Sequence, residues 1–211
     1  MLRKNLVFFI PYIIFIIISS LLLIFFPKDE IHIFINRHYS NFFDIFFKVF
    51  TTLGNGWFIA ALTLVLLFYR YRLALLVGIS GIISGLIVQL LKRFVFEDVL
   101  RPVSHFNGVY DLHLINGVHN LSYYSFPSGH SASAFSAFLA LALTTDNQLL
   151  KFIYFLIAML VAYSRMYLSQ HFLEDVFAGA IIGILITVPV YLFLYYKSNN
   201  RLDNSILGKA Y

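Results

Sequence analysis

Three polar stretches interrupt an otherwise apolar chain, and their side chains are of the types that bind phosphate and move protons. The stretches run from Lys92 to Arg101-Pro102, from Pro127 to His130, and from Ser164 to Asp175. Charged groups at the edge of long apolar runs are costly and tend to be kept for a function. Arginine and lysine bind phosphoryl oxygens, and histidine gains or loses a proton near neutral pH. The combination predicts a phosphoryl-transfer site.

The third stretch has the most demanding spacing. His171 and Asp175 are four residues apart, so on a helical turn at the start of the last apolar run they share one face. The carboxylate then holds one ring N–H, and the other ring nitrogen is free to attack phosphorus. Arg165 lies six residues before His171, which on a continuous helix would place it on another face. It reaches the same phosphoryl group only if a turn intervenes, and we place this turn at Ser169-Gln170. Taken alone, an interfacial His–Asp pair with a snorkelling arginine accounts for this spacing equally well.

The second stretch, Pro127-Ser128-Gly129-His130, stands directly before a run of small residues at 131–134. Serine is a favoured N-cap, glycine allows close backbone approach, and a helix N-terminus offers free N–H groups to an anion. We therefore predict a phosphate cradle at Ser128 and Gly129. His130 adds a group that donates a proton to the leaving oxygen. For this motif alone, a plain turn and helix cap is the alternative.

The first stretch places Lys92, Arg93 and Arg101 at the end of an apolar run. A forked guanidinium and a compact ammonium are suitable clamps for the non-bridging oxygens of a phosphoryl group. By itself, ordinary snorkelling at a helix end is the alternative. The chain has no cysteine, and its other five histidines show no metal-ligand spacing, so we expect no metal and no cofactor. Glu97 and Asp98 lie nearby and receive no catalytic role.

The composition places these stretches in a membrane protein. Hydrophobic residues make up 60% of the 211 residues and charged residues 12%, with a mean hydropathy of +0.83, which is too apolar for an ordinary soluble domain. The net charge of +5 does not indicate nucleic acid binding, because lysine and arginine lie mainly beside apolar runs. We predict one membrane-embedded domain over residues 1–211.

A helix that crosses the hydrocarbon core needs about 20 mostly apolar residues. Six runs approach this length, at 6–26, 54–69, 73–91, 131–143, 152–163 and 176–196. Residues 31–50 mix phenylalanine and isoleucine with polar residues, which predicts an amphipathic segment at the membrane interface. The first run lacks a small-residue cleavage site and is interpreted as a retained span. The predicted fold is an all-α, integral membrane six-helix transmembrane bundle with an interfacial segment after the first span.

The distribution of lysine and arginine predicts the orientation. With the N-terminus in the cytoplasm, eight such residues lie inside: Arg3, Lys4, Arg70, Arg72, Lys151, Lys197, Arg201 and Lys209. Seven lie outside, and four of these belong to or adjoin the polar stretches, which leaves three for the comparison. The bias indicates that all three stretches face the exterior. The two loops that carry them then open on one side, so a shared site becomes possible.

Together the stretches resemble the signature of the type 2 phosphatidic acid phosphatase family. That signature is Lys, six residues, Arg-Pro; then Pro-Ser-Gly-His; then Ser-Arg, five residues, His, three residues, Asp. The second and third parts match completely. The first part departs, because eight residues separate Lys92 from Arg101 and seven separate Arg93 from it. Lys92 looks like the family lysine with a loop lengthened by two residues, and Arg93 is the alternative.

The resemblance implies a metal-independent phosphatase with a family-like core at about 51–196. In it, His171 forms a phosphohistidine, Asp175 orients the imidazole, and His130 protonates the leaving group. The implied phosphate-binding residues are Lys92, Arg101, Ser128, Gly129 and Arg165.

An external site on a small membrane protein suits an amphiphile whose phosphate stays at headgroup level while its tail remains in lipid. The resemblance therefore implies a lipid phosphate substrate in a bacterial inner membrane, with the active site facing the periplasm. We favour undecaprenyl diphosphate, followed by the phosphates of lipid A, with phosphatidylglycerol phosphate and phosphatidic acid as further alternatives. Outside this class, a haloperoxidase that binds vanadate shares the signature, and a non-enzymatic membrane bundle is the other alternative.

Two further features bear on specificity and assembly. The loop at 103–126 carries several histidine and tyrosine residues, and we hypothesise that it shapes the headgroup pocket or covers the site. Gly81 with Gly85, and Gly179 with Gly183, have a small-xxx-small spacing, which favours close packing inside one bundle over dimerisation. The oligomeric state stays open.

Overall fold

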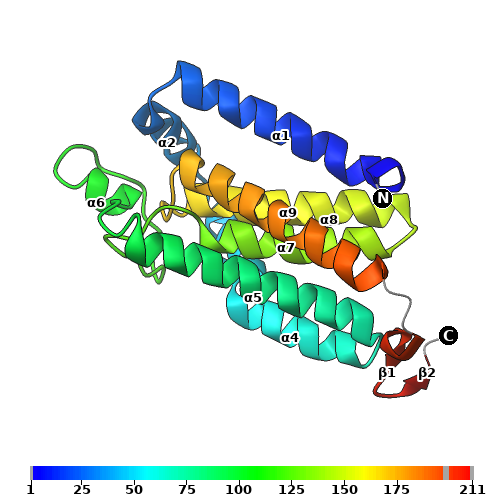
Figure 1. Ribbon diagram of the computed structural model, residues 1–211. Coiled ribbons are helices and arrows are strands. Elements are labelled where there is room, and N and C mark those ends of the chain that lie inside the picture. The colour runs from blue at the N-terminus through cyan, green and yellow to red at the C-terminus, as the bar shows by residue number, and fades with distance from the viewer. Residues whose placement is uncertain (1, 197–199, 210–211) are drawn as a thin grey trace.

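Helix α7, Gly129–Thr144, lies at the centre of the bundle in the computed structural model (Figure 1), which describes residues 2–196 and 200–209. It contacts α4 (Gly56–Leu67), α5 (Tyr71–Phe94), α8 (Gln148–Tyr167) and α9 (Leu173–Tyr196). Its many alanine and serine side chains are small enough to let these helices approach closely, and most of them are fully buried. The helix that begins at the second polar stretch is therefore enclosed by protein.

Two glycines allow α9 to lie directly on α7. A side chain at Gly179 would place its Cβ 2.4 Å from the carbonyl oxygen of Ser128, and one at Gly183 would lie 2.6 Å from that of Ala132. Only glycine permits backbones to approach this closely. The predicted packing of this glycine pair inside one bundle is confirmed.

The second glycine pair is used only in part. Gly81 on α5 faces Ile59 on α4, because a Cβ at this glycine would lie 2.9 Å from the Ile59 side chain. A Cβ at Gly85 would meet no atom within 4 Å among the described residues. Within the bundle, only the Gly81 half of this motif serves helix packing.

Four helical segments are long and apolar enough to cross a membrane. They are Arg3–Phe25, which covers α1 (Leu6–Phe25) and all but the first residue of η1 (Leu2–Asn5), and helices α5, α8 and α9. A fifth span results if the bent pair of Asn41–Gly54 and α4, with a bend of 58°, counts as one. The predicted all-α membrane bundle is thus confirmed with four to five candidate spans. The predicted run at 54–69 becomes α4, a shorter helix of 12 residues that Asn55 caps at its start. The predicted run at 131–143 lies within α7, a helix of 16 residues that starts earlier because Ser128 caps it.

Residues 31–50 contribute to two short helices rather than one amphipathic segment. α2 (Lys28–Arg37) and α3 (Asn41–Phe50) are separated at residues 38–40, where Ser40 caps α3 by accepting a hydrogen bond from the amide of Phe43. α3 exposes Phe42 and Ile45 and packs Phe47 against Tyr167 of α8. The prediction of an amphipathic character therefore fits α3 best. Helix α3 continues into the short 3₁₀ helix η2 (Thr51–Gly54), which lies against α7 and α8.

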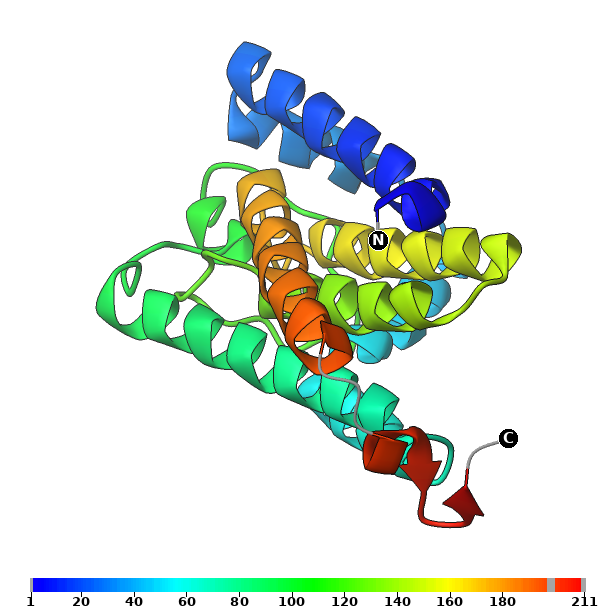
Figure 2. The same cartoon turned by 45° about the vertical axis from the view of Figure 1, so that its right-hand side comes forward.

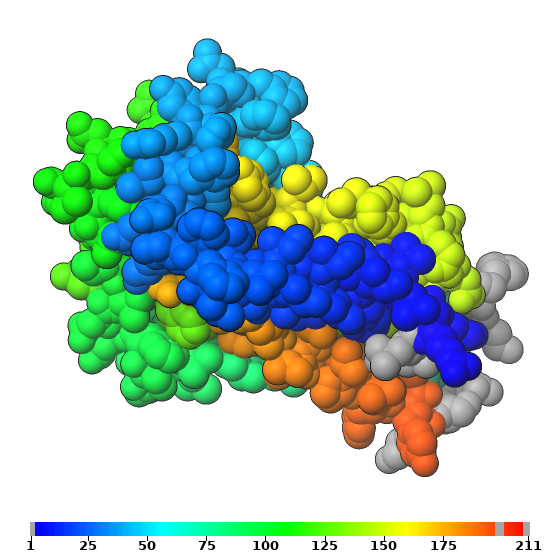
Figure 3. All heavy atoms as spheres, turned by 90° about the horizontal axis from the view of Figure 1, so that it is seen from above, coloured from blue at the N-terminus to red at the C-terminus, as the bar shows by residue number. Residues whose placement is uncertain are grey.

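The polar stretches meet at one end of the bundle. α2, α6 (Pro102–His105) and the loop after α6 gather there, while the described parts of both chain ends lie at the opposite end (Figure 1). α1 lies on the outside of the bundle against α8 and α9 (Figure 2). From above, α1 forms a long ridge, and α2 and α3 adjoin the loop at one end of it (Figure 3). The predicted opening of both loops on the same side is confirmed.

The C-terminal segment adds a small feature outside the helical bundle. After η3 (Asn200–Asp203), the strands β1 (Asn204–Ser205) and β2 (Gly208–Lys209) form a small antiparallel hairpin. Two contacts fasten this segment to the bundle. The amide of Ile206, in the turn of the hairpin, donates a 3.0 Å hydrogen bond to the carbonyl of Leu67, and Asp203 at the end of η3 pairs with Arg72 at 2.8 Å. Gly208 has a φ of 118°, a backbone conformation that favours glycine.

Candidate active site

A cavity of about 510 Å³ lies where the three polar stretches meet. Residues of each stretch line it: Lys92 and Arg101 from the first, Gly129 and His130 from the second, and Arg165, Gln170 and His171 from the third. Further lining residues are Lys48, Thr51, Gln89, Gly117, Val118, His119, Leu121 and Leu168. None of these described lining residues is acidic. The cavity thus concentrates positive charge and imidazole groups, as a phosphate site requires.

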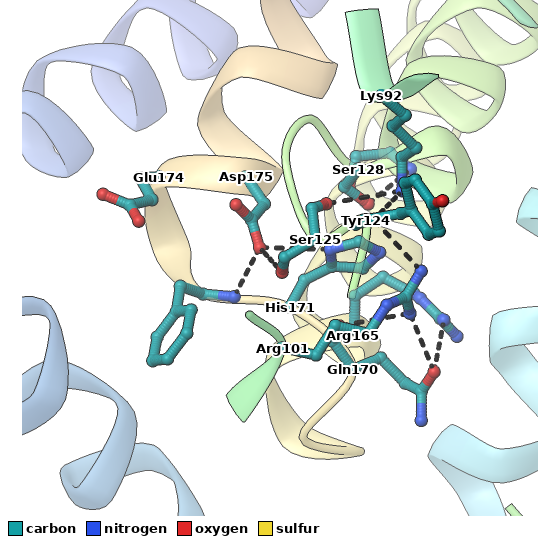
Figure 4. A network of polar contacts seen from close by, with 12 residues as sticks. Lys92, Arg101, Tyr124, Ser125, Ser128, Arg165, Gln170, His171, Glu174 and Asp175 are labelled. Atoms are coloured by element: carbon teal, nitrogen blue, oxygen red, sulfur yellow. Dashed lines mark hydrogen bonds and ion pairs between the residues drawn. The ribbon is translucent and has the colours of Figure 1, made fainter. Parts of the chain in front are cut away.

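His171 and Asp175 form the hydrogen-bonded pair that their spacing predicts. His171 Nδ1 lies 3.1 Å from Asp175 Oδ2, and both side chains are buried (Figure 4). The same carboxylate oxygen accepts hydrogen bonds from the hydroxyl of Ser125 at 2.5 Å and from the amide of Phe172 at 2.9 Å. The carboxylate therefore places the ring proton on Nδ1 and leaves Nε2 with a free lone pair.

The environment favours the neutral form of the His171 imidazole. Burial, followed by the positive charges of Lys92, Arg101 and Arg165, holds the pKa of His171 well below its usual range. A neutral imidazole with a proton on Nδ1 is the nucleophilic form of histidine. The charges that lower this pKa are also the charges that attract a phosphate.

Two arginines flank the cavity and are joined by one side chain. Gln170 Oε1 accepts hydrogen bonds from Arg101 Nη1 at 3.2 Å and from Arg165 Nη2 at 3.3 Å (Figure 4). Arg165 Nη1 also donates to Thr51 Oγ1 at 2.7 Å, while its Nε is buried without an acceptor among the described residues. The predicted turn between Arg165 and His171 is confirmed: α8 ends at Tyr167, and Ser169 has a φ of 52°.

Lys92, rather than Arg93, lines this cavity (hereafter the catalytic cavity). The Lys92 side chain is 6% exposed, and its ammonium group donates to the carbonyl oxygens of Tyr124 at 2.6 Å and Ser125 at 3.4 Å. Arg93 is the next residue along α5, about 100° further around the helix, and it is exposed. The longer gap before Arg101 is thus accommodated in the loop that follows α5.

Ser128 caps α7 as predicted, but its hydroxyl faces the protein. It accepts hydrogen bonds from the amide of Ser131 at 3.4 Å and from the Ser131 hydroxyl at 2.9 Å, and its side chain is fully buried. Its own amide donates to the carbonyl oxygen of Asp175 at 2.9 Å, which ties the second stretch to the third. Gly129 and His130 line the cavity, whereas Ser128 does not. Direct phosphate binding by the Ser128 side chain stays a prediction.

The long loop forms part of the cavity wall and is clipped to the helices around it. Gly117 and His119 line the cavity. His105 pairs with Asp29 of α2 at 2.9 Å, and His113 pairs with Asp44 of α3 at 2.9 Å. These pairs hold the loop over the end of the bundle. That the loop shapes a headgroup pocket stays a prediction.

Three residues near the reacting groups were not predicted as site residues: Ser125, Thr51 and Gln170. Ser125 stands two residues before Pro127 and has no motif or period of its own, so its contact with Asp175 depends on how the loop folds back. Gln170 was expected only as part of a turn. Its position immediately before His171 was the one available signal, because a side chain at that position enters the same cavity.

The comparison with protein families decides the identity of this site. The model described as the PAP2 superfamily matches residues 72–199, which contain all three stretches. The chain belongs to the PAP2 superfamily. The resemblance to type 2 phosphatidic acid phosphatases is therefore confirmed, and the protein is a metal-independent membrane lipid phosphatase.

Named relatives of this PAP2 phosphatase support the assignment. A lipid A 4'-phosphatase of Bacteroides thetaiotaomicron is 30% identical over 189 residues, which cover 86% of this chain and 83% of the relative. The crystal structure of Aquifex aeolicus LpxE has a TM-score of 0.68 and 31% identity, covering 76% of this chain and 92% of that one. The transmembrane PAP2 type phosphatidylglycerolphosphate phosphatase of Bacillus subtilis shares the fold, with a TM-score of 0.66 and 23% identity over 94% and 99% of the two chains.

Proposed function

We propose that this PAP2 phosphatase removes a phosphate group from a lipid A-type glycolipid, using His171 as the nucleophile. The observation that carries the chemistry is the pairing of His171 Nδ1 with Asp175 Oδ2 at the wall of a cavity that also holds Lys92, Arg101 and Arg165. The substrate class is supported by the relatives above 25% identity, a lipid A 4'-phosphatase and LpxE. These similarities favour lipid A over undecaprenyl diphosphate, the substrate that the sequence favoured.

The first chemical step is an in-line displacement at phosphorus. The lone pair of His171 Nε2 forms the N–P bond, and the bond between phosphorus and the lipid oxygen breaks. The lipid oxygen takes the electron pair and receives a proton from His130, while Asp175 stabilises the positive charge on the His171 ring. Arg165, Arg101 and Lys92 hold the non-bridging oxygens, where charge accumulates in the transition state.

The second step releases phosphate. His130, now neutral, takes a proton from a water molecule, whose oxygen attacks the phosphohistidine. The N–P bond breaks, its electron pair returns to His171 Nε2, and inorganic phosphate leaves. In this mechanism the amide of Gly129, which lines the cavity at the start of α7, donates a hydrogen bond to a phosphoryl oxygen.

We further propose that the cavity faces the exterior of a bacterial inner membrane. In this arrangement the six membrane segments are α1, α4, α5, α7, α8 and α9. Helix α7 has only 16 residues, but the helices around it shield it from lipid, so it does not have to span the full thickness of the bilayer. The bias of lysine and arginine supports this orientation. A periplasm-dependent reporter inserted within residues 103–125 is expected to be active; an inactive reporter with an active cytoplasmic reporter at the same position contradicts the orientation.

The decisive experiment measures phosphate release from a panel of lipids by purified protein in detergent micelles. The panel contains lipid A, undecaprenyl diphosphate, phosphatidylglycerol phosphate and phosphatidic acid. We expect the highest kcat/KM for lipid A and loss of activity to background in His171→Ala. His38→Ala is the matched control, because His38 is exposed and its side chain contacts the carbonyl and the ring of Phe34, away from the cavity. Undiminished release by His171→Ala contradicts the nucleophile, and preference for another lipid contradicts the substrate.

A further inference from the structure

A second basic cavity of about 400 Å³ adjoins the catalytic cavity. The two share Gln89, Lys92, Arg101 and Leu121 in their walls, so they lie side by side. The second cavity adds Arg93 and Tyr124. It therefore extends from the phosphate clamp towards the exposed side of α5, where Arg93 lies.

The three cations of this second cavity differ in what they already bind. Lys92 donates to two backbone carbonyls, and Arg101 donates to the carbonyls of Tyr123 and Tyr124 and to Gln170. Arg93 makes no hydrogen bond or ion pair with any residue that the structure describes. Its full fork of N–H groups is thus available at the rim of the cavity.

The charge in this region is one-sided. Lys92, Arg93 and Arg101 line the second cavity, and none of its described lining residues is acidic. A single phosphoryl group at His171 is already served by Lys92, Arg101 and Arg165 in the catalytic cavity. Arg93 is too far around α5 to join that clamp, because it is exposed while the neighbouring Lys92 points inward. The additional cation fits a second anionic group.

We propose that Arg93, with the outer sides of Lys92 and Arg101, forms a second anion subsite that binds a further phosphate or carboxylate of the substrate headgroup beside the phosphate attacked by His171. This inference rests on the proposed phosphatase function and specifies its substrate class as a lipid with two neighbouring anionic groups. A lipid diphosphate and a phosphorylated glycolipid with an adjacent acidic sugar both present this chemistry. A lipid monophosphate with a neutral headgroup fills only the catalytic cavity.

The test compares substrates that differ by one anionic group and share one tail. Farnesyl diphosphate and farnesyl phosphate form the first pair; a lipid A precursor with an adjacent acidic sugar and the same glycolipid without it form the second. For Arg93→Gln we expect kcat/KM to fall about tenfold on the doubly anionic member of at least one pair, as for loss of one charge-assisted hydrogen bond, and less than about twofold on its partner. The pair that responds identifies the source of the second anion. Arg93→Lys is expected to recover part of the loss, because it restores the charge without the fork.

A charge control separates local binding from general attraction. Lys48 is exposed and lies in the wall of the catalytic cavity but not of the second cavity. Lys48→Gln removes the same charge, and we expect it to change both members of a pair by the same factor. Equal effects of Arg93→Gln on both members of both pairs overturn the subsite while leaving the proposed function intact. If the wild-type protein releases phosphate from none of these lipids, the proposed function fails and the subsite with it.

Discussion

The hydroxyl of Ser125 donates a 2.5 Å hydrogen bond to Asp175 Oδ2, the same oxygen that faces Nδ1 of the proposed nucleophile. Ser125 is fully buried and belongs to the loop that precedes α7, whereas Asp175 belongs to the first turn of α9. One hydrogen bond therefore couples the loop before the second polar stretch to the third stretch. It also holds the carboxylate in the orientation that positions the imidazole of His171.

Ser125→Ala is expected to lower kcat by about ten- to hundredfold with little change in KM. The substitution removes a hydrogen bond to a charged group, worth about 1.5–3 kcal/mol, and lets the carboxylate turn away from the ring. Steady-state kinetics on the best lipid substrate measure this. Ser122→Ala is the control, since the Ser122 side chain is exposed in the same loop. Equal kcat values for the two variants contradict a positioning role of Ser125.

Gln170→Glu is expected to weaken substrate binding more than it slows turnover. The new carboxylate would stand between Arg101 and Arg165 and compete with the substrate phosphate for their N–H groups. It would also lose the donor that Gln170 Nε2 offers to Asn120 and to the His119 carbonyl.

We expect the KM of Gln170→Glu to rise about tenfold or more and inhibition by inorganic phosphate to weaken in parallel. Gln148→Glu, an exposed change of the same kind at the start of α8, controls for the added charge. An unchanged KM for Gln170→Glu contradicts the bridging role.

The pH dependence follows from the lowered pKa of His171. Since burial and the neighbouring cations lower this pKa, the ring stays neutral above its ordinary value of 6.5 and for some distance below it. The acid limb that His171 contributes to kcat/KM is therefore expected below pH 6.5. NMR titration of ring-labelled histidine, with His171→Ala for assignment, measures this pKa directly. A His171 pKa at or above 6.5 in the free enzyme contradicts the electrostatic description of the site.

Gly179→Ala is expected to destabilise the protein by about 1–3 kcal/mol, because the new Cβ would lie 2.4 Å from the Ser128 carbonyl oxygen and force α9 away from α7. This shift would also displace the start of α7 and reduce activity. Gly85→Ala is the matched control, since a Cβ there meets no described atom within 4 Å. Thermal unfolding in detergent is expected to show a lower Tm for Gly179→Ala and an unchanged or slightly higher Tm for Gly85→Ala. The reverse order contradicts the close packing of α7 and α9.

Chelation is expected to leave activity unchanged. In the proposed mechanism, Lys92, Arg101 and Arg165, which line the cavity, supply the positive charge that metal ions supply in other phosphoryl-transfer sites. Phosphate release in the presence of excess EDTA, compared with a magnesium-dependent phosphatase treated in the same way, measures this. Loss of activity that added Mg²⁺ restores would show that the cationic side chains are insufficient.

The helices and their order were predictable because apolar runs of limited length are a local property. The predicted run at 6–26 differs from α1 by one residue at its end, and the runs at 73–91 and 176–196 lie within α5 and α9. The shorter α4 and α7 were harder, because hydropathy does not reveal which helices are enclosed by others. The break between α2 and α3 was missed for a similar reason, since a single cap at Ser40 decides it.

By itself, the sequence determined the family of this protein, because the second and third motifs match the family signature completely. It also determined that His171 and Asp175 share one face of a helical turn, because the i, i+4 geometry follows from local backbone structure. Only the tertiary structure decided three further features of the site. They are the choice of Lys92 over Arg93, the hydrogen bond from Ser125 to Asp175, and the bridge that Gln170 forms between two arginines. These contacts join residues that are far apart in the chain or that differ only in the helix face they occupy. Their formation depends on how closely α7 and α9 pack and how the long loop folds back over them, which no local pattern encodes.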